Sequence, residues 1–393
     1  MRRVMTLTLF AAALVFGARG LHAQGDGGYK LVPNWPKLPP GMYFGLKDAP
    51  PPPAERDAQA AARRASGRGT TSPPPAAAGG ASTGSGQAGA GSGQNANAAG
   101  PTNQPGISGL AIDQHDHIYV FNRGVKPVMV FDTEGNLILS GADQVINGKT
   151  INPSWQHSGG VDWEGNVYVI ERDAHRIVKL NSKLDTFLLQ LGTTNEKGND
   201  ATHLNLPSGI AILHNGNMIV TDGYGNNRVV LFDKTGKFIK QVGKGSGGPA
   251  DKGAGPGEWN LPHKLAVDAS ENLYIIDREG HRVEVFDKNL NYLREIRNDW
   301  NPWDINISRK GTDGIGWIAD HKDERVLKFN LKDGKILAVW GKQGWGPSEF
   351  DWVHGIVVDS KGAVYAADTY GQRLQKFVRQ PERPATADAH KGH

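Results

Sequence analysis

Three histidines share one position in a pattern that repeats along the chain. In each repeat we count five residues back from the residue that precedes the first turn. The six positions found this way are Ser108, His157, Ser208, His263, Trp303 and His354. Three imidazoles that converge on one axis, with no fourth protein ligand, form the ligand set of a catalytic metal ion with an open coordination position. Neutral imidazole suits Zn²⁺ best, with Fe²⁺, Cu²⁺ and Ni²⁺ as alternatives.

A second set of equivalent positions directly follows the second apolar run of each repeat. We expect these positions to lie on loops at one face of the folded repeats. Arg123, Tyr224 and Arg278 lie in this set and are candidates to surround the metal ion. An arginine can hold a carboxylate through two hydrogen bonds, and a tyrosine can act as a general base. Two further members, Arg172 and Tyr370, are interpreted as surface packing.

The elements that must position these residues come in six similar copies. From residue 106 onward each copy has an apolar run, an Asp or its equivalent, a turn, a second run, a polar loop and a third run, as in PHKLAVDASENLYIIDREGHRVEVFD. Alternating Val, Ile, Tyr and Phe between Gly, Asn and Asp turns indicates short antiparallel strands. Six such units predict an all-β fold, a six-bladed β-propeller whose innermost strands line a central channel. The histidines outside the shared position, His321 among them, are interpreted as mostly solvent-facing.

The chain divides into five segments. Residues 1–23 have the basic start, apolar stretch and small-residue exit of a signal peptide. Residues 24–49 are expected to supply a strand that closes the propeller. Residues 50–104 are rich in Pro, Ala, Gly and Ser and predict a disordered linker. Residues 105–379 form the propeller, and residues 380–393 form a polar tail.

Charge and composition exclude several classes of function. Removal of the signal peptide takes away three arginines and no acid, so the formal net charge of +4 falls by three to +1. A nearly neutral protein lacks the electrostatic footprint of a nucleic-acid binder. The chain has no Cys, which excludes disulfides and thiolate ligands. We expect a secreted or periplasmic monomer that does not insert into the membrane.

At the histidine and loop residues the sequence resembles the peptidyl-α-hydroxyglycine α-amidating lyase (peptidylamidoglycolate lyase) family, six-bladed propellers of the NHL-repeat type. The similarity runs over about residues 106–377 and is densest in DGYGNNRVVLFDKTGKF, LPHKLAVD and DREGHRVEVFD. The resemblance implies that His157, His263 and His354 are zinc ligands.

The resemblance also assigns roles to the loop residues. It implies a catalytic tyrosine at Tyr224 and two functional arginines at Arg123 and Arg278. The implied reaction cleaves the N–C bond of a peptidyl-α-hydroxyglycine, or of a related α-hydroxy amide, to leave an amide and glyoxylate. The family also holds a structural calcium with an Asp where this chain has Gly355, so calcium is possible here but not favoured.

Two other functions stay open. A non-enzymatic NHL propeller that binds a protein or a glycan would keep the fold without this chemistry. A calcium-dependent propeller lactonase or esterase needs carboxylate and Asn ligands on the axis, and the channel register offers Ser, His and Trp instead.

Overall fold

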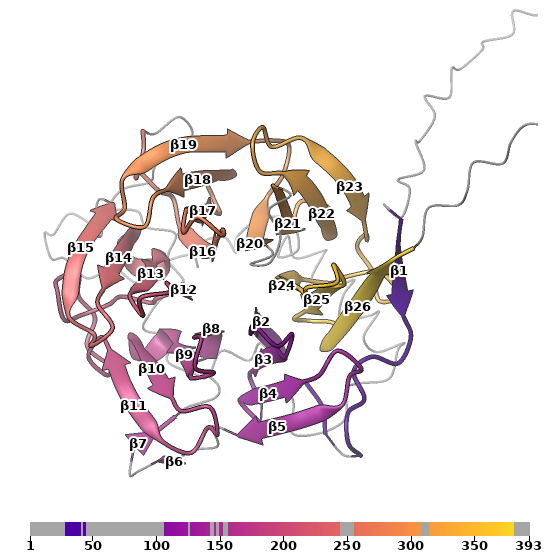
Figure 1. Ribbon diagram of the computed structural model, residues 1–393, viewed down its shortest axis with the longest axis horizontal. Helices are drawn as coiled ribbons and strands as arrows, with labels where there is room; N and C mark the ends of the chain where they lie inside the picture. The colour runs from indigo at the N-terminus through magenta and orange to yellow at the C-terminus, as the bar shows by residue number, and fades with distance from the viewer. Residues whose placement is uncertain are drawn as a thin grey trace, which may run out of the picture.

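The computed structural model describes residues 28–40, 42–44, 106–124, 126–141, 145–146, 149–151, 156–243, 255–307 and 314–380. These residues form six four-stranded antiparallel sheets arranged as blades around a common axis, which confirms the predicted six-bladed β-propeller (Figure 1). The predicted signal peptide, the predicted linker of residues 50–104 and residues 381–393 of the predicted tail lie outside the described residues.

Each blade runs from an innermost strand to an outermost strand. Blade one contains β2 (Ile107–Ile112), β3 (Ile118–Asn122), β4 (Val128–Phe131) and β5 (Leu137–Gly141). Blade two contains β8 (Gln156–Val161), β9 (Val167–Glu171), β10 (Arg176–Leu180) and β11 (Phe187–Leu191). Blade three contains β12 (Gly209–Ile212), β13 (Met218–Asp222), β14 (Arg228–Phe232) and β15 (Phe238–Gly243).

The second half of the ring repeats this order. Blade four contains β16 (Pro262–Val267), β17 (Leu273–Asp277), β18 (Arg282–Phe286) and β19 (Tyr292–Arg297). Blade five contains β20 (Pro302–Ile307), β21 (Ile315–Asp320), β22 (Arg325–Asn330) and β23 (Ile336–Trp340). Blade six contains β24 (Val353–Val358), β25 (Val364–Asp368), β26 (Arg373–Arg379) and β1 (Tyr29–Val32). A small hairpin of β6 (Val145–Ile146) and β7 (Lys149–Thr150) forms a separate sheet, and its Ile146 packs into the core between blades one and two.

Blade six draws its strands from both ends of the described chain. Strand β1 pairs antiparallel with β26, with Tyr29 opposite Arg379. The ring of Tyr29 stacks on Trp340 of blade five at 4.5 Å between centroids. Trp35 packs against Tyr365 of blade six and Phe131 of blade one, so the N-terminal segment bridges the first and last blades.

The hydrophobic core consists of separate clusters, one between each pair of neighbouring blades. Phe121 and Val169, for example, belong to one cluster between blades one and two. Because the two faces of each blade both pack on neighbours, the strands carry apolar side chains on both faces.

A recurrent ion pair fixes the loop between the second and third strands of a blade. Arg228 and Asp222 are directly paired residues of β13 and β14, and their side chains meet at 2.9 Å. Equivalent pairs are Arg176–Glu171, Arg282–Asp277, Arg325–Asp320 and Arg373–Asp368. These pairs lie within one blade, where they lock the loops that carry the candidate site residues.

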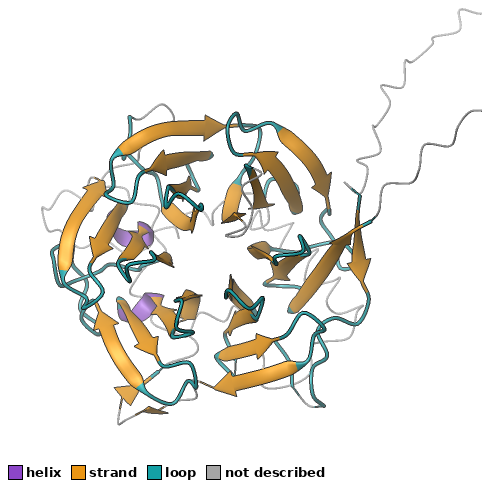
Figure 2. Ribbon diagram, in the orientation of Figure 1, coloured by secondary structure: helices purple, strands orange, loops and turns teal. Residues whose placement is uncertain are grey.

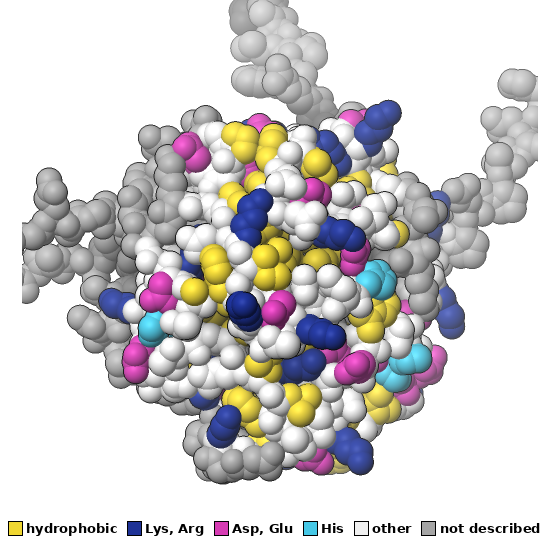
Figure 3. Space-filling model, turned by 60° about the vertical axis from the view of Figure 1, so that its left-hand side comes forward, with side chains coloured by type: hydrophobic (Ala, Val, Ile, Leu, Met, Phe, Trp, Pro, Cys, Tyr) yellow, Lys and Arg dark blue, Asp and Glu magenta, His cyan; other side chains and the backbone are white. Residues whose placement is uncertain are grey.

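Among the described residues, helix is limited to two short turns, η2 (Arg172–Ala174) after β9 and α2 (Gly223–Asn226) after β13 (Figure 2). Within the described ranges no helix has the length and apolar content that crossing a membrane requires. The face in Figure 3 mixes basic, acidic and apolar side chains without a field of one sign.

Candidate metal centre

The three register histidines come together on the axis. His157, His263 and His354 lie on the innermost strands of blades two, four and six and are buried. Their ring centroids are 5.0 to 5.2 Å apart in every pair. In each of these strands the pairing register shifts at the histidine, which makes it a β-bulge residue. A bulge re-aims a side chain, and here it accompanies imidazoles that converge.

The blades without a histidine fix the orientation of each imidazole. His157 Nδ1 lies 3.0 Å from the carbonyl oxygen of Ser208, and His354 Nδ1 lies 3.0 Å from that of Ser108. His263 Nδ1 lies 2.6 Å from the carbonyl oxygen of Trp303. A carbonyl only accepts, so each Nδ1 carries the proton and each Nε2 keeps its lone pair. The acceptors are the register residues of the next blade, so all six blades contribute to the ring.

The nitrogens that keep their lone pairs point at one another. His157 Nε2 and His263 Nε2 are 3.3 Å apart, and ligand atoms of all three histidines lie within 4.8 Å of one another. Two ligand nitrogens on one tetrahedral zinc ion, at Zn–N distances of about 2.0–2.1 Å, are about 3.3 Å apart. Burial, together with the neighbouring cationic groups, lowers the pKa of all three histidines well below the usual value. Neutral imidazoles with facing lone pairs fit a bound cation.

Tyr224 places its hydroxyl at the same point. Tyr224 Oη lies 3.0 Å from Nε2 of His157 and 3.0 Å from Nε2 of His263. The tyrosine lies in the helical turn α2, which packs directly on the strand of His263. A Cβ atom at Gly223 would lie 2.1 Å from the carbonyl oxygen of Pro262, so only glycine permits this close approach.

Two guanidinium groups flank the tyrosine ring. Arg172 and Arg278 both lie 5.3 Å from the ring centroid of Tyr224, and Arg278 Nη1 donates to its hydroxyl oxygen at 3.2 Å. Each arginine is held by the carboxylate of the residue that follows it, Asp173 or Glu279.

The interpretation of Arg172 as surface packing is therefore wrong, because its side chain is only 8% exposed and contacts the tyrosine. A signal for it existed in the sequence. The triplets Glu171-Arg172-Asp173 and Asp277-Arg278-Glu279 both place an arginine between two acids at equivalent positions.

Arg123 lies beside the same centre. Its Nε–H donates to the carbonyl oxygen of Gln156, the residue before His157, at 2.8 Å. Burial and then the like charge of Arg172 lower the pKa of Arg123 to about 10. Cations this close together create a preference for an anionic group, and a carboxylate suits the planar geometry of guanidinium.

Aromatic side chains from blades five and six line the other side of the candidate metal centre. Trp303 lies 4.9 Å from Trp352, and Trp352 lies 4.9 Å from Tyr370, all measured between ring centroids. His321 packs between the two tryptophans and pairs with Glu324. The interpretation of His321 as solvent-facing is therefore wrong, since the side chain is buried. Arg278 stacks over Trp303 at 4.3 Å, so the basic and aromatic halves meet there.

The next residues along the six innermost strands form a second ring, which consists of Gly109, Ser158, Gly209, Lys264, Asp304 and Gly355. The side chain of Lys264 crosses from blade four to blade two and donates to Ser158 Oγ. Calcium requires six to eight oxygen ligands. The side chains of this ring offer one carboxylate and one hydroxyl group beside an ammonium group, so by themselves they do not supply a calcium ligand set.

Comparisons with known proteins agree with this fold. Residues 161–312 match a family described as "6-bladed beta-propeller" (DUF5128), and residues 350–377 match the NHL repeat. "Peptidyl-glycine alpha-amidating monooxygenase" of Mus musculus is 28% identical over 305 residues, which cover 70% of this chain and 30% of that protein. "Probable peptidyl-alpha-hydroxyglycine alpha-amidating lyase pgal-1" of Caenorhabditis elegans is 28% identical over 204 residues, which cover 47% of this chain and 56% of that protein. "NHL repeat-containing protein 3" of Mus musculus is 26% identical over 282 residues, which cover 66% of this chain and 76% of that protein.

The relatives named above are 26–28% identical to this chain over the aligned residues. The chain carries an NHL repeat and a six-bladed propeller domain, and relatives named as hydroxyglycine lyases confirm the resemblance. The chain spans about 30% of the length of the mouse and rat amidating monooxygenases that it matches.

Proposed function

We propose that this NHL propeller is an exported, zinc-dependent lyase that cleaves the N–C bond of an α-hydroxyglycine-type carbinolamide into an amide and glyoxylate. The observation that carries the proposal is the meeting of ligand atoms from three imidazoles, two of which lie 3.0 Å from the Tyr224 hydroxyl that Arg278 also contacts. Relatives named as amidating lyases support the same reaction class.

The metal site would be held by His157, His263 and His354 through Nε2. A zinc ion bound there supplies Lewis acidity, which lowers the pKa of a hydroxyl group that it coordinates. The Nδ1 hydrogen bonds to backbone carbonyls orient the imidazoles and increase their basicity as ligands.

The loop residues would bind and deprotonate the substrate. The α-carboxylate of an α-hydroxyglycine is an anion that the guanidinium groups of Arg123, Arg172 and Arg278 can hold. Tyr224 Oη then takes the proton of the substrate hydroxyl group as a general base. The O–H electron pair becomes the C=O bond of glyoxylate, the C–N bond breaks, and the amide nitrogen receives the proton that Tyr224 holds. No water and no redox partner enter the balance.

Metal content and product formation test this proposal together. We expect about one zinc per chain in the purified protein and release of glyoxylate from a peptide that ends in α-hydroxyglycine. The double variant His157→Ala/His263→Ala should lose both the metal and glyoxylate release. His203→Ala, which changes a histidine outside the ring at a surface cluster with Asp200, is the matched control and should keep both.

Two results would contradict the proposal. A protein that binds no transition metal after zinc is supplied would favour a non-enzymatic propeller that binds a protein or glycan. A protein that binds one zinc per chain at the histidines, yet releases no glyoxylate from any α-hydroxy amide, would retain the metal site and lose the lyase assignment.

A further inference from the structure

A hydrogen bond across the axis joins two of the three strands that carry the histidines. Lys264 directly follows His263 on β16. Ser158 directly follows His157 on β8. The ammonium group of Lys264 donates to Ser158 Oγ, so this bond connects the neighbours of two candidate metal ligands. Blade three lies between blades two and four in the ring, and the bond therefore spans the central channel (Figure 1).

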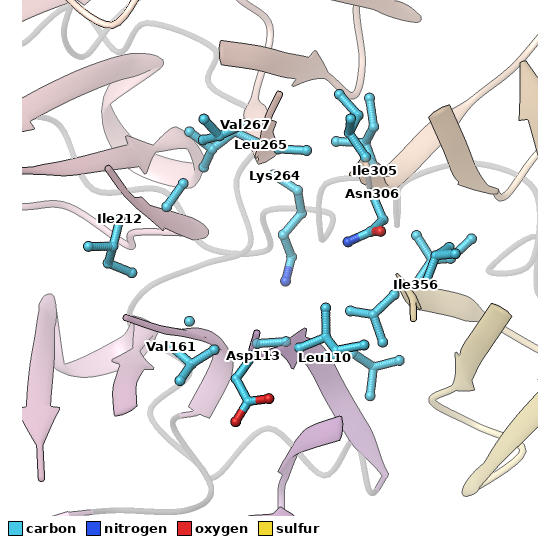
Figure 4. A pocket seen from close by; sticks show the side chains of 18 of the residues that line it. Leu110, Asp113, Val161, Ile212, Lys264, Leu265, Val267, Ile305, Asn306 and Ile356 are labelled. Carbon is cyan, nitrogen blue, oxygen red and sulfur yellow. The ribbon is translucent and has the colours of Figure 1, made fainter. Parts of the chain in front are cut away.

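A cavity borders this bond on the side of the second ring that faces away from the loop residues. Its volume is about 360 Å³, and the innermost strands of all six blades line it. Figure 4 shows the Lys264 side chain extending into the middle of this cavity. Protein atoms that border a cavity lack packing partners on that side. Packing across the axis therefore does not fix the distance between these strands, and a hydrogen bond across it can.

Glycines on the neighbouring blades leave room for the two bonded side chains. A Cβ atom at Gly109 would lie 2.4 Å from Ser158 Oγ. A Cβ atom at Gly209 would lie 3.2 Å from the Cα atom of Lys264. The second-ring positions of blades one and three thus carry no side chain where those of blades two and four meet.

The third histidine strand is held by Asp304, another member of the second ring. One carboxylate oxygen of Asp304 accepts a hydrogen bond at 3.2 Å from the backbone N–H of Ile356, which lies two residues after His354 on β24. The other oxygen accepts from the backbone N–H of Ile305 at 2.8 Å. Side chains of the second ring therefore hold all three strands that carry the histidines.

The ammonium group of Lys264 is costly for the fold itself. Lys264 is only 4% exposed, and within the described part of the chain it forms no ion pair. Burial of an unpaired charge costs free energy, and an apolar side chain in place of a buried charged group often leaves stability unchanged or higher. Lys264 therefore contributes little to the stability of the fold, and its bond to Ser158 acts on the geometry of the site.

We propose that Lys264 is a positioning residue for the metal centre. Its hydrogen bond to Ser158 sets the separation of β8 and β16, and with it the 3.3 Å between the Nε2 atoms of His157 and His263. This inference rests on the proposed function in one respect, namely that the three histidines bind zinc. A site of this kind needs its ligands held within about 0.5 Å of their binding geometry. Partners outside the ligand shell contribute about 10–100-fold to metal affinity.

A positioning role and a purely electrostatic role predict opposite changes in zinc affinity. The ammonium group and a bound Zn²⁺ ion repel each other, so loss of the charge alone should tighten zinc binding. Loss of the hydrogen bond should weaken zinc binding, because the separation of the imidazoles is no longer fixed. Ser158→Ala removes the acceptor and keeps the charge of Lys264, so it separates the two roles.

The experiment measures the zinc Kd of the full chain at pH 8 by competition with a chromogenic chelator. Imidazoles are neutral at this pH, so competition with protons does not differ between variants. We expect Lys264→Met and Ser158→Ala each to weaken zinc binding about 10–100-fold. The double variant should bind zinc no more weakly than the weaker single variant, since both changes remove the same bond. Lys288→Met changes a lysine whose side chain is 52% exposed and is the matched control, with unchanged Kd.

Two further measurements distinguish a positioning residue from a merely structural one. The thermal unfolding midpoint of the zinc-free Lys264→Met protein should equal or exceed that of the zinc-free parent. The visible spectrum of the Co²⁺-loaded protein reports ligand geometry and should change in both single variants. A lower unfolding midpoint with unchanged zinc affinity and an unchanged spectrum would show that Lys264 is only structural.

The remaining outcomes also decide the question. Tighter zinc binding by Lys264→Met, or unchanged binding by Ser158→Ala, would overturn the positioning role and leave the proposed function intact. A parent protein that binds zinc but releases no glyoxylate would refute the lyase assignment and leave this test valid. A parent protein that binds no zinc would overturn both proposals.

Discussion

Replacement of Tyr224 by phenylalanine separates the metal site from the proposed proton transfer. The substitution keeps the ring between the guanidinium groups of Arg172 and Arg278 and removes only Oη, which lies 3.0 Å from two imidazole nitrogens. All three Nε2 atoms and their Nδ1 hydrogen bonds stay in place, so zinc content should not change. Loss of a positioned general base costs about 10²–10⁴ in kcat, or about 3–5 kcal/mol of transition-state stabilisation.

The assay measures zinc per chain by mass spectrometry and glyoxylate release in a single turnover on the same sample. Tyr292→Phe is the matched control, because it removes a phenol hydroxyl from an exposed residue on the outermost strand of blade four and should change kcat less than threefold. A Tyr224→Phe protein with full zinc content and kcat within fivefold of the parent would refute the assignment of the base. Loss of zinc from this variant would show that the phenol helps to hold the metal.

Three further predictions concern substrate binding, ring closure and pH. Arg172→Met should lower kcat/KM about 10–100-fold, mainly through a higher KM, since a charged hydrogen bond contributes about 1.5–3 kcal/mol; unchanged steady-state kinetics would exclude Arg172 from substrate binding. Tyr29→Ala should lower the free energy of unfolding by about 3–5 kcal/mol in urea titration, because it removes a buried ring that stacks on Trp340; a loss below about 1 kcal/mol would contradict the role of β1 in closure. Burial, opposed by Arg282, raises the pKa of Glu284 to about 7, so its contribution to stability is full below about pH 4.5 and is lost as pH rises through 7. The free energy of unfolding of Glu284→Gln should therefore exceed that of the parent by about 1–3 kcal/mol at pH 8 and by little at pH 4. An equal difference at both pH values would contradict this assignment.

The fold could be predicted because the pattern of six repeats is strong. Apolar runs, turns and spacing recur in every copy, and only a propeller buries six equivalent four-stranded units around one axis. The same repetition made the three histidines recognisable, since a residue that differs between otherwise equivalent repeats is easily identified. Their orientation could not be predicted, because the backbone carbonyls of Ser108, Ser208 and Trp303 that fix it have no signature in sequence.

The positions of Lys264 and His321 could not be predicted, because they depend on local backbone geometry and packing. Lys264 follows His263 directly, and simple strand alternation would place only one of the two at the axis. The β-bulge between Pro262 and Leu265 breaks this alternation, so that His263 joins the histidine cluster while Lys264 lines the cavity beside it. The sequence predicts a solvent-facing His321 because a turn position is usually exposed. In the structure Trp303 and Trp352 cover this side chain.

Closure of the ring has a consequence for the order in which the metal site forms. His354 lies on β24 of blade six, whose sheet is complete only when β26 meets β1 from the other end of the chain. During synthesis, which proceeds from the N-terminus, the growing chain offers two of the three imidazoles well before the third exists. If the three histidines bind a metal ion as proposed, the full ligand set exists only after the last blade has formed, and metal uptake would then report that stage of assembly.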